Sequence, residues 1–243
     1  MIGNLRSELL KQRSTQTTIY LFLAMFALVA LAVTMHVVAL GADDLSSRTN
    51  QLEVFQVGTR AGMLFAGLAG AIAFTAELRY GTIRPTFLVT PGRGPVLAAK
   101  LAVGVLVGLV FGLVAEAFMV GDAAVAFAAR GIDNELTGGD YVQLLTGGAA
   151  SAALWAAAGV GVGALIRNQV AALVGLCAWM FVVESTSESF VPGFGRLLPG
   201  SAGLALAGNT DDLSAAVAAL LLVLYAAAAA AFGWRVTLRR DIP

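Results

Sequence analysis

The feature that most constrains this chain is a series of long apolar runs that contain few charges. The clearest run covers Thr18–Leu40, 23 residues counted from 18 to 40, and a helix needs about 20 apolar residues to cross a bilayer. It is longer than the apolar part of a signal peptide and lacks a convincing cleavage site. Only 12% of the chain is charged, where a soluble domain has about 25%. The sequence therefore predicts an all-α integral membrane protein.

Six spans account for residues 18–243, and the fifth is the weakest of them. Only 14 residues, from Val170 to Val183, precede Glu184, and this length is equally typical of a re-entrant segment. We predict a crossing, because Arg235 and Arg239 would otherwise lie on the side of the acidic connections. The predicted spans are about 18–40, 58–76, 96–120, 141–166, 170–187 and 213–234.

Charges divide unevenly between the two sides of this arrangement. Of the 15 basic residues, 11 lie on the side of the two termini and 4 on the opposite side. Of the 15 acidic residues, 3 lie on the terminal side, 11 on the opposite side, and Glu116 lies within a span. Lys and Arg mark the cytoplasmic face. The sequence predicts a multi-pass protein of the cell membrane with both termini in the cytoplasm.

The segment before the first span, residues 1–17, is short and amphipathic. Leu5, Leu9 and Leu10 alternate with charged residues at roughly helical spacing. Such a pattern favours an interfacial helix that lies along the inner leaflet. The alternative is flanking charge that only fixes the topology.

Glycine spacing indicates how the spans associate. Gly104, Gly108 and Gly112 recur at every fourth position of the third span and therefore share one helix face. Small residues let membrane helices approach closely. The same reasoning applies to smaller sets in the second and fourth spans, namely Gly58, Gly62, Gly67, Gly70, Gly159 and Gly163.

Few ionisable residues fall within the spans. Glu116 lies near the outer end of the third, His36 near the outer end of the first, and Arg60 at the outer start of the second. An intramembrane charge is a candidate for function. Glu116 and Arg60 could face a pathway, but a structural role is the favoured interpretation, either by snorkelling to the outer face or as an Arg60–Glu116 pair.

The connection before the last span is unusually apolar. Residues 188–208 contain Pro192, Pro199 and five glycines, which prevent one continuous helix. We predict a re-entrant segment of two short helices in the outer leaflet, because broken backbone at that depth needs cover from protein or water. A lipid-facing hairpin without a role is the alternative.

Signatures of catalysis are missing from the sequence. It has no Gly-x-x-x-x-Gly-Lys-Ser/Thr loop for nucleotide phosphates and no Gly-x-Ser-x-Gly elbow. One histidine and one cysteine, Cys177, cannot build a His/Cys metal site. The sequence predicts no enzyme activity and no bound cofactor or metal, and its net charge of zero gives no reason to expect nucleic acid.

The connection between the second and third spans is longer and more basic than a simple turn requires. Gly81 can end one helix and Thr82 can cap the next, while Pro91-Gly92 ends that second helix. About two helical turns remain, with apolar Ile83, Phe87 and Leu88 beside Arg84. The segment suits a short surface helix that contacts a soluble partner. An ordinary basic cytoplasmic loop is the alternative.

The run from Glu77 to Thr86 (ELRYGTIRPT), with Pro91, Arg93 and Lys100, resembles the Glu-x-x-x-Gly-Thr…Thr…Pro-x-Arg…Lys signature of ABC-2 type permeases, the membrane subunits of type V ABC exporters. The resemblance implies that residues 82–90 are a coupling helix that docks on an ATPase. The implied coupling residues are Glu77, Gly81, Thr82, Ile83, Arg84, Thr86, Phe87, Leu88 and Arg93.

Further partners are implied by the same resemblance. Two copies of a separate ATPase subunit would hold ATP and Mg, and a second permease subunit, identical or homologous, would complete a central pathway. The chain would then be the permease subunit of an ATP-driven exporter for an apolar or amphipathic substrate, such as a drug, peptide or lipid-linked molecule. A non-transporting membrane scaffold and an ion-coupled secondary carrier remain alternatives.

Overall fold

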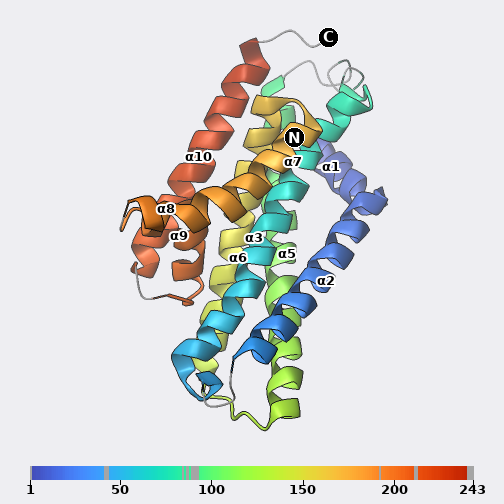
Figure 1. Ribbon diagram of the computed structural model, residues 1–243. Helices are drawn as coiled ribbons and strands as arrows, with labels where there is room; N and C mark the ends of the chain where they lie inside the picture. The colour runs from blue at the N-terminus through green and yellow to red at the C-terminus, as the bar shows by residue number, and fades with distance from the viewer. Residues whose placement is uncertain are drawn as a thin grey trace.

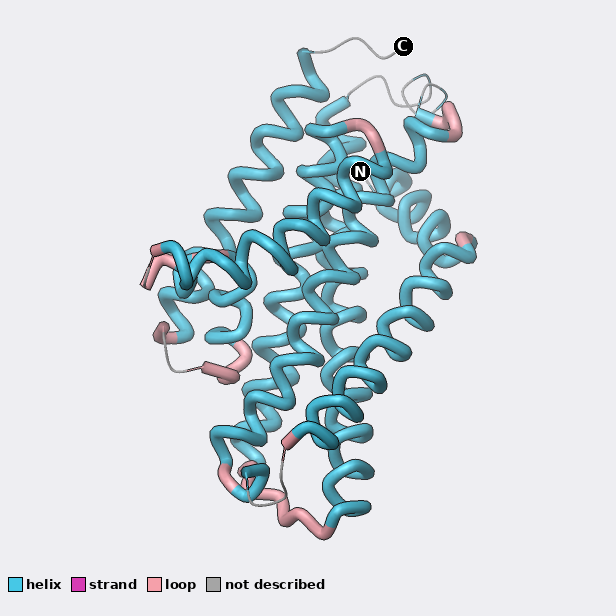
Figure 2. Tube along the Cα trace, viewed as in Figure 1, coloured by secondary structure: helices cyan, strands magenta, loops and turns pink. Residues whose placement is uncertain are grey.

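The computed structural model describes residues 2–40, 44–83, 85, 88, 93–191, 193–210 and 213–239, and these residues form helices and connections without a β-strand. Six helices are long and apolar enough to cross a membrane. They run side by side as a bundle in Figure 1, and Figure 2 shows that helix dominates the traced chain. The predicted all-α class and the six membrane-length helices are confirmed.

Helix bounds run along the chain in this order. The longer helices are α1 (Ile2–Ser14), α2 (Gln16–Ala39), α3 (Arg48–Arg79), α5 (Arg93–Arg130), α6 (Gly138–Ile166), α7 (Gln169–Ala178) and α10 (Ala215–Arg239). The shorter ones are the 3₁₀ turns η1 (Asp44–Ser46) and η3 (Gly195–Leu197), the π-helical turn η2 (Trp179–Val183), α8 (Glu184–Phe190) and α9 (Pro199–Leu206).

The two ends of the bundle differ in charge. One end, at the top of Figure 1, holds α1, the last turns of α3 and α10, and the start of α7. We call it the basic end, because Arg79, Lys100 and Arg167 lie there. The opposite end holds the α2–α3 and α5–α6 connections. We call it the acidic end, after Asp133, Glu135 and Asp140 in the α5–α6 connection and the first turn of α6.

Helices α3, α5 and α6 form the centre of the bundle, where glycines allow backbones to touch. A Cβ atom added at Gly70 of α3 would lie 2.1 Å from the carbonyl oxygen of Ala156 in α6. A Cβ added at Gly159 of α6 would lie 2.1 Å from that of Gly67. Gly104, Gly108 and Gly112 of α5 all face α6 as well. In a membrane, such close backbone contact provides the dispersion energy that holds helices together.

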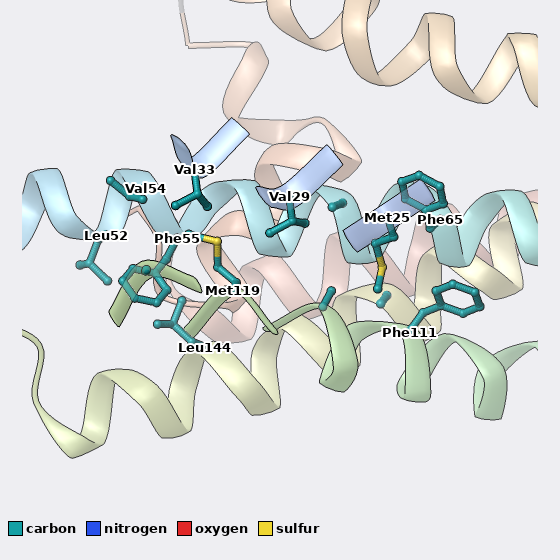
Figure 3. Packing of buried hydrophobic residues seen from close by; sticks show 14 of the residues in the cluster. Met25, Val29, Val33, Leu52, Val54, Phe55, Phe65, Phe111, Met119 and Leu144 are labelled. Atoms are coloured by element: carbon teal, nitrogen blue, oxygen red, sulfur yellow. The ribbon is translucent and has the colours of Figure 1, made fainter. Parts of the chain in front are cut away.

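The largest apolar cluster lies between α2, α3, α5 and α6. It includes Met25, Val29 and Val33 of α2 with Phe55 of α3 and Met119 of α5, and Figure 3 shows Met25 toward Phe65 and Phe111. The ring of Phe22 stacks on that of Phe111 with centroids 4.0 Å apart. This cluster fixes α2, whose opposite side is exposed, against the central helices.

Helices α3 and α5 extend beyond the apolar spans predicted for them. Helix α3 begins at Arg48 instead of about 58, and α5 ends at Arg130 instead of about 120. Ser47 caps α3 by accepting from the backbone N–H of Asn50. Buried Gln51 then donates to the carbonyls of Leu45 and Asp133 at 3.0 and 2.7 Å. The length of the apolar run does not predict this extension, because polar side chains that hydrogen-bond to the neighbouring connections stabilise it.

The fifth membrane-length helix is irregular. It covers Gln169–Ser187 and contains the π-helical turn η2, a feature that is often found at functional sites. The chain then returns to the bundle as α9, and Trp155 of α6 donates to the carbonyl of Pro199 at 3.3 Å. Trp155 lies 11 positions before Ile166, or about 16 Å along the helix. Helix α9 thus begins partway along α6, and its re-entrant course in a membrane stays a prediction.

Candidate coupling region and buried polar clusters

The connection after α3 has one anchored and one exposed apolar residue. Gly81 takes a positive φ of 70°, which a glycine adopts without strain, and it is exposed together with Thr82. Ile83 is only 3% exposed and packs with Phe74 and Leu97, whereas Leu88 is 82% exposed.

Not all of the predicted coupling residues are described. Arg84, Thr86 and Phe87 lie outside the described residues, and Arg93 is the first residue of α5. The described part of residues 82–90 is therefore fixed to the bundle through Ile83 and presents Leu88 outward.

Glu77 in the last turn of α3 belongs to a buried ion cluster with Lys100 of α5 and with Glu8 and Lys11 of α1. The ammonium group of Lys100 is 2.8 Å from both Glu8 Oε2 and Glu77 Oε1, and it also donates to the carbonyl of Ala73 at 3.0 Å. Lys11 reaches Glu8 Oε1 at 2.7 Å and Glu77 Oε1 at 2.6 Å. Two carboxylates and two ammonium groups thus balance in charge and join three helices.

Burial makes this cluster different from a surface ion pair. Lys100 is 1% exposed, so loss of one partner would leave a buried charge unpaired. Burial by itself would lower the pKa of Lys11, but hydrogen bonds and charge from Glu77 and Glu8 outweigh it and raise that pKa above its ordinary value. Lys11 therefore stays protonated at neutral pH and contributes a positive charge to the cluster.

Sequence reasoning missed Glu8 and Lys11 as site residues. It placed the N-terminal helix along the inner leaflet without a charged contact to the spans, yet Glu8 is buried and faces Lys100. The i, i+3 spacing of Glu8 and Lys11 was the available signal. That spacing predicts a local pair, but it does not indicate that α3 and α5 lie opposite.

Two cavities adjoin the ion cluster and the α6–α7 connection at the basic end. The first, about 280 Å³, lies between α1, α2 and α3 and is lined by Glu77, Lys11, Thr15, Thr18 and Ala73 among others. The second, about 470 Å³, is lined by Thr75, Leu78, Arg79, Arg167, Asn168, Gln169 and Val170. The basic end is thus hollowed on both sides of the last turn of α3, which precedes the exposed connection.

Glu116 of α5 lies in a second buried cluster, and it is not paired with Arg60. Its Oε1 accepts from the hydroxyl of Thr59 at 2.5 Å, and Asn209 donates to that hydroxyl at 2.7 Å. Arg60 is exposed and donates to Gln56 at 3.5 Å. The predicted Arg60–Glu116 pair is therefore wrong. Consecutive helix residues point about 100° apart, so Thr59 faces α5 and Arg60 is turned away.

Glu184 ties the fifth helix to α9. Its Oε1 accepts from the backbone N–H of Gly200 at 2.8 Å and from the indole of Trp179 at 2.8 Å. A carboxylate at a helix N-terminus satisfies free N–H groups. A Cβ at Gly200 would lie 1.8 Å from Glu184 Oε2, so a larger residue here would displace the carboxylate from the start of α9. Sequence reasoning noted Glu184 as the first charge after the apolar run Val170–Val183 and did not predict its contact with α9.

Among the described residues, no group of three or more His, Cys, Asp or Glu side chains could hold a metal ion. Comparison with known proteins adds no identification, since no protein-family model and no curated protein matches the chain. The geometry of the two clusters and of the exposed connection is therefore the basis for a functional assignment.

Proposed function

We propose that this protein is the membrane-spanning permease subunit of an ATP-driven exporter of the ABC-2 type, with both termini and the basic end in the cytoplasm. The ELRYGTIRPT signature and the charge division support the proposal, together with six membrane-length helices. ATP hydrolysis would occur on a separate subunit, which would hold ATP and Mg.

One observation carries the proposal furthest. The buried ion cluster joins α1, α3 and α5 at Glu77, five positions before Thr82. A movement of residues 82–90 would therefore act on three helices together. Because the cluster is buried and balanced in charge, separation of these helices costs more than separation of an exposed ion pair. This arrangement is what a mechanical link between an ATPase and a membrane pathway requires.

The exposed connection suits contact with a partner subunit. Ile83 fixes its first turn to the bundle, and Leu88 lies 82% exposed, so an apolar side chain is free to enter a pocket on the ATPase. The cavity beside Arg79 and Arg167 would face the same partner and favour acidic groups there. Charge complementarity of this kind guides orientation and association rate.

The opposite half of the molecule is consistent with an apolar or amphipathic substrate. A cavity of about 170 Å³ between α2, α3 and the fifth helix is lined by Leu28, Ala32, Val57, Arg60, Ala61, Leu64, Met180 and Phe181. A second permease subunit would pair beside this region. Helix α9, capped by Glu184, would be the re-entrant element at the outer end of the pathway.

The experiment is co-purification with an ATPase subunit that carries a Walker A motif and is encoded beside this chain. Leu88→Asp, and separately the double variant Arg84→Glu with Phe87→Ala, should insert normally but fail to retain the ATPase or stimulate its hydrolysis. An aromatic anchor at an interface can contribute about 2 kcal/mol or more. The matched control, Arg196→Glu with Phe194→Ala, changes the same residue types before α9 and should retain the partner. Binding by all variants would contradict the proposal and favour a membrane scaffold.

The buried carboxyl of Glu116 supports an ion-coupled secondary carrier as the second candidate. A carrier of that kind would move its substrate in liposomes under a proton or sodium gradient without any ATPase. An exporter subunit would need the ATPase and ATP. Transport measured under the two conditions separates these candidates.

A further inference from the structure

Glu116, Thr59 and Asn209 form a hydrogen-bonded chain that ends in two unsatisfied acceptors. The Thr59 hydroxyl donates to Glu116 Oε1 at 2.5 Å and accepts from Asn209 Nδ2 at 2.7 Å. Glu116 is 0% exposed, and neither its Oε2 nor Asn209 Oδ1 has a hydrogen-bond partner in the described structure. Buried acceptors are normally satisfied, so this chain lacks a donor.

Charged side chains on the surrounding elements do not compensate for Glu116 among the described residues. On α3, Arg60 donates to Gln56 and Glu53 is exposed. On α6, Asp140 pairs with Arg48. The nearest other charge of α5, Asp122, is itself acidic.

The remaining neighbours bring no cation either. Helix α9 has no charged residue, and α2 has only His36. Asp211 and Asp212 lie outside the described residues. An ionised Glu116 would be an isolated buried charge, which is strongly unfavourable.

The carboxyl group is also tightly enclosed by backbone. A Cβ at Gly148 of α6 would lie 2.4 Å from Glu116 Oε1, and one at Gly58 of α3 would lie 3.2 Å from Oε2. Two glycines thus let α3 and α6 close over the acid, and little room is left for a hydrated ion. A proton removes the charge, converts one acceptor into a donor and requires no added volume.

We propose that Glu116, Thr59 and Asn209 are an occluded proton-binding site in which Glu116 is protonated at neutral pH. The neutral acid lets α3, α5, α6 and residues 207–210, the first part of the connection after α9, pack together. Loss of the proton creates a charge that needs water, and water reaches it when Asn209 leaves Thr59. Proton release is therefore linked to opening of residues 207–210, which include Asn209. This inference does not rest on an ATPase partner.

Infrared spectroscopy of the purified protein tests the protonation state directly. At neutral pH the wild type should show the C=O band of a protonated carboxyl group, shifted in D₂O, and Glu116→Gln should lose it. The matched controls Glu53→Gln and Glu135→Gln change exposed acids and should retain the band. A wild type without the band, or a band that survives in Glu116→Gln, would overturn the site.

A second variant keeps the test valid if Glu116→Gln fails to fold. Thr59→Val is nearly isosteric and removes the hydroxyl that bonds to Glu116 Oε1, so the band should move to higher frequency. An unshifted band would show that the protonated group lies elsewhere. Thermal stabilisation of the wild type by Na⁺ or K⁺, but not by N-methyl-D-glucamine, and its loss in Glu116→Gln would identify a metal-cation site and contradict the proton site.

The link to opening is tested by accessibility of the connection after α9. Thr210→Cys is placed in a Cys177→Ser background, with and without Glu116→Gln, and modified by an impermeant thiol reagent over a range of pH. The ratio of the two labelling rates cancels the titration of the thiol itself. The labelling rate of the protein that retains Glu116, divided by that of the Glu116→Gln protein, should rise several-fold at alkaline pH. A constant ratio would overturn the link between proton release and opening.

Discussion

Helix α5 carries two buried ionisable side chains, one in each half of the molecule, and they differ in whether a group of opposite charge contacts them. Lys100, toward the basic end, contacts two carboxylates and a backbone carbonyl. Glu116, 16 positions further and about 24 Å along the helix, has one neutral donor and an unsatisfied oxygen. Equal burial thus coexists with a partner of opposite charge in one cluster and none in the other, although Glu77 Oε2 in the ion cluster also lacks a hydrogen-bond partner.

This difference separates a structural cluster from the cluster that we propose binds and releases a proton. In the buried ion cluster, every charge has a partner of opposite sign, so a change of protonation would break contacts among three helices. In the Glu116 cluster, a proton supplies what is missing without moving any helix. The glycine contacts of α3, α5 and α6 run between the two clusters.

The largest expected effect comes from removing the central cation. Lys100→Met should destabilise the protein by about 3–5 kcal/mol, because Glu8 and Glu77 are then left buried with only Lys11. Thr59→Val removes two hydrogen bonds at the Glu116 cluster, one to Glu116 Oε1 and one from Asn209 Nδ2, and should cost about 1–3 kcal/mol, because buried polar groups then lose a partner. Thermal unfolding in detergent measures both. Equal losses would break the contrast between the two clusters.

A smaller effect is expected in the glycine contacts that lie between the clusters. Gly108→Ala should destabilise by about 1–3 kcal/mol, as overpacking does, because the new Cβ would lie 2.6 Å from the carbonyl oxygen of Ala152. Gly121→Ala is the matched control in the same helix, since nothing lies within 4 Å of its Cβ. The control should gain up to about 1 kcal/mol. If both alanine variants had the same melting temperature, close packing at Gly108 would not contribute to the stability of the region between the clusters.

The smallest effect is expected at the edge of the ion cluster. Lys11 has a side chain that is 41% exposed, so Lys11→Ala should cost less than about 1 kcal/mol. Its pKa is raised above the ordinary 10.5, so the folded state binds its proton more tightly than the unfolded state. The contribution is complete below about pH 10.5 and is lost as pH rises through the raised pKa. A difference between wild type and variant that grew with pH would contradict this sign.

Much of the coarse fold could be predicted from the sequence, because bilayer thickness imposes a length on every apolar run. The six membrane-length helices follow from that constraint, and the break between α3 and the next segment follows from Gly81, which takes the positive φ that glycine tolerates. The four-residue repeat of Gly104, Gly108 and Gly112 likewise indicates one face, since helix geometry fixes it. These are local properties of the chain.

The candidate site could be predicted only in part from the sequence, because the residues that contact one another there are distant along the chain. Glu8 and Lys100 are 92 positions apart, and so are Arg48 and Asp140. The acidic-end extension of α3 depends on Gln51, which bonds to a carbonyl 82 positions away. Spacing along one segment contains no information about such contacts.

The all-helical class, the number of long helices and the residues that interrupt them can be predicted from the amino-acid order, because backbone geometry and hydrocarbon solvation act locally. The neutralisation of Lys100 inside the bundle and the turn of Arg60 away from Glu116 depend on tertiary packing. The rotation of each helix about its axis sets those pairs. That rotation results from the packing of all its neighbours together. Glycine contacts let three backbones approach closely enough to enclose Glu116, which has no counter-ion in the described part of the chain.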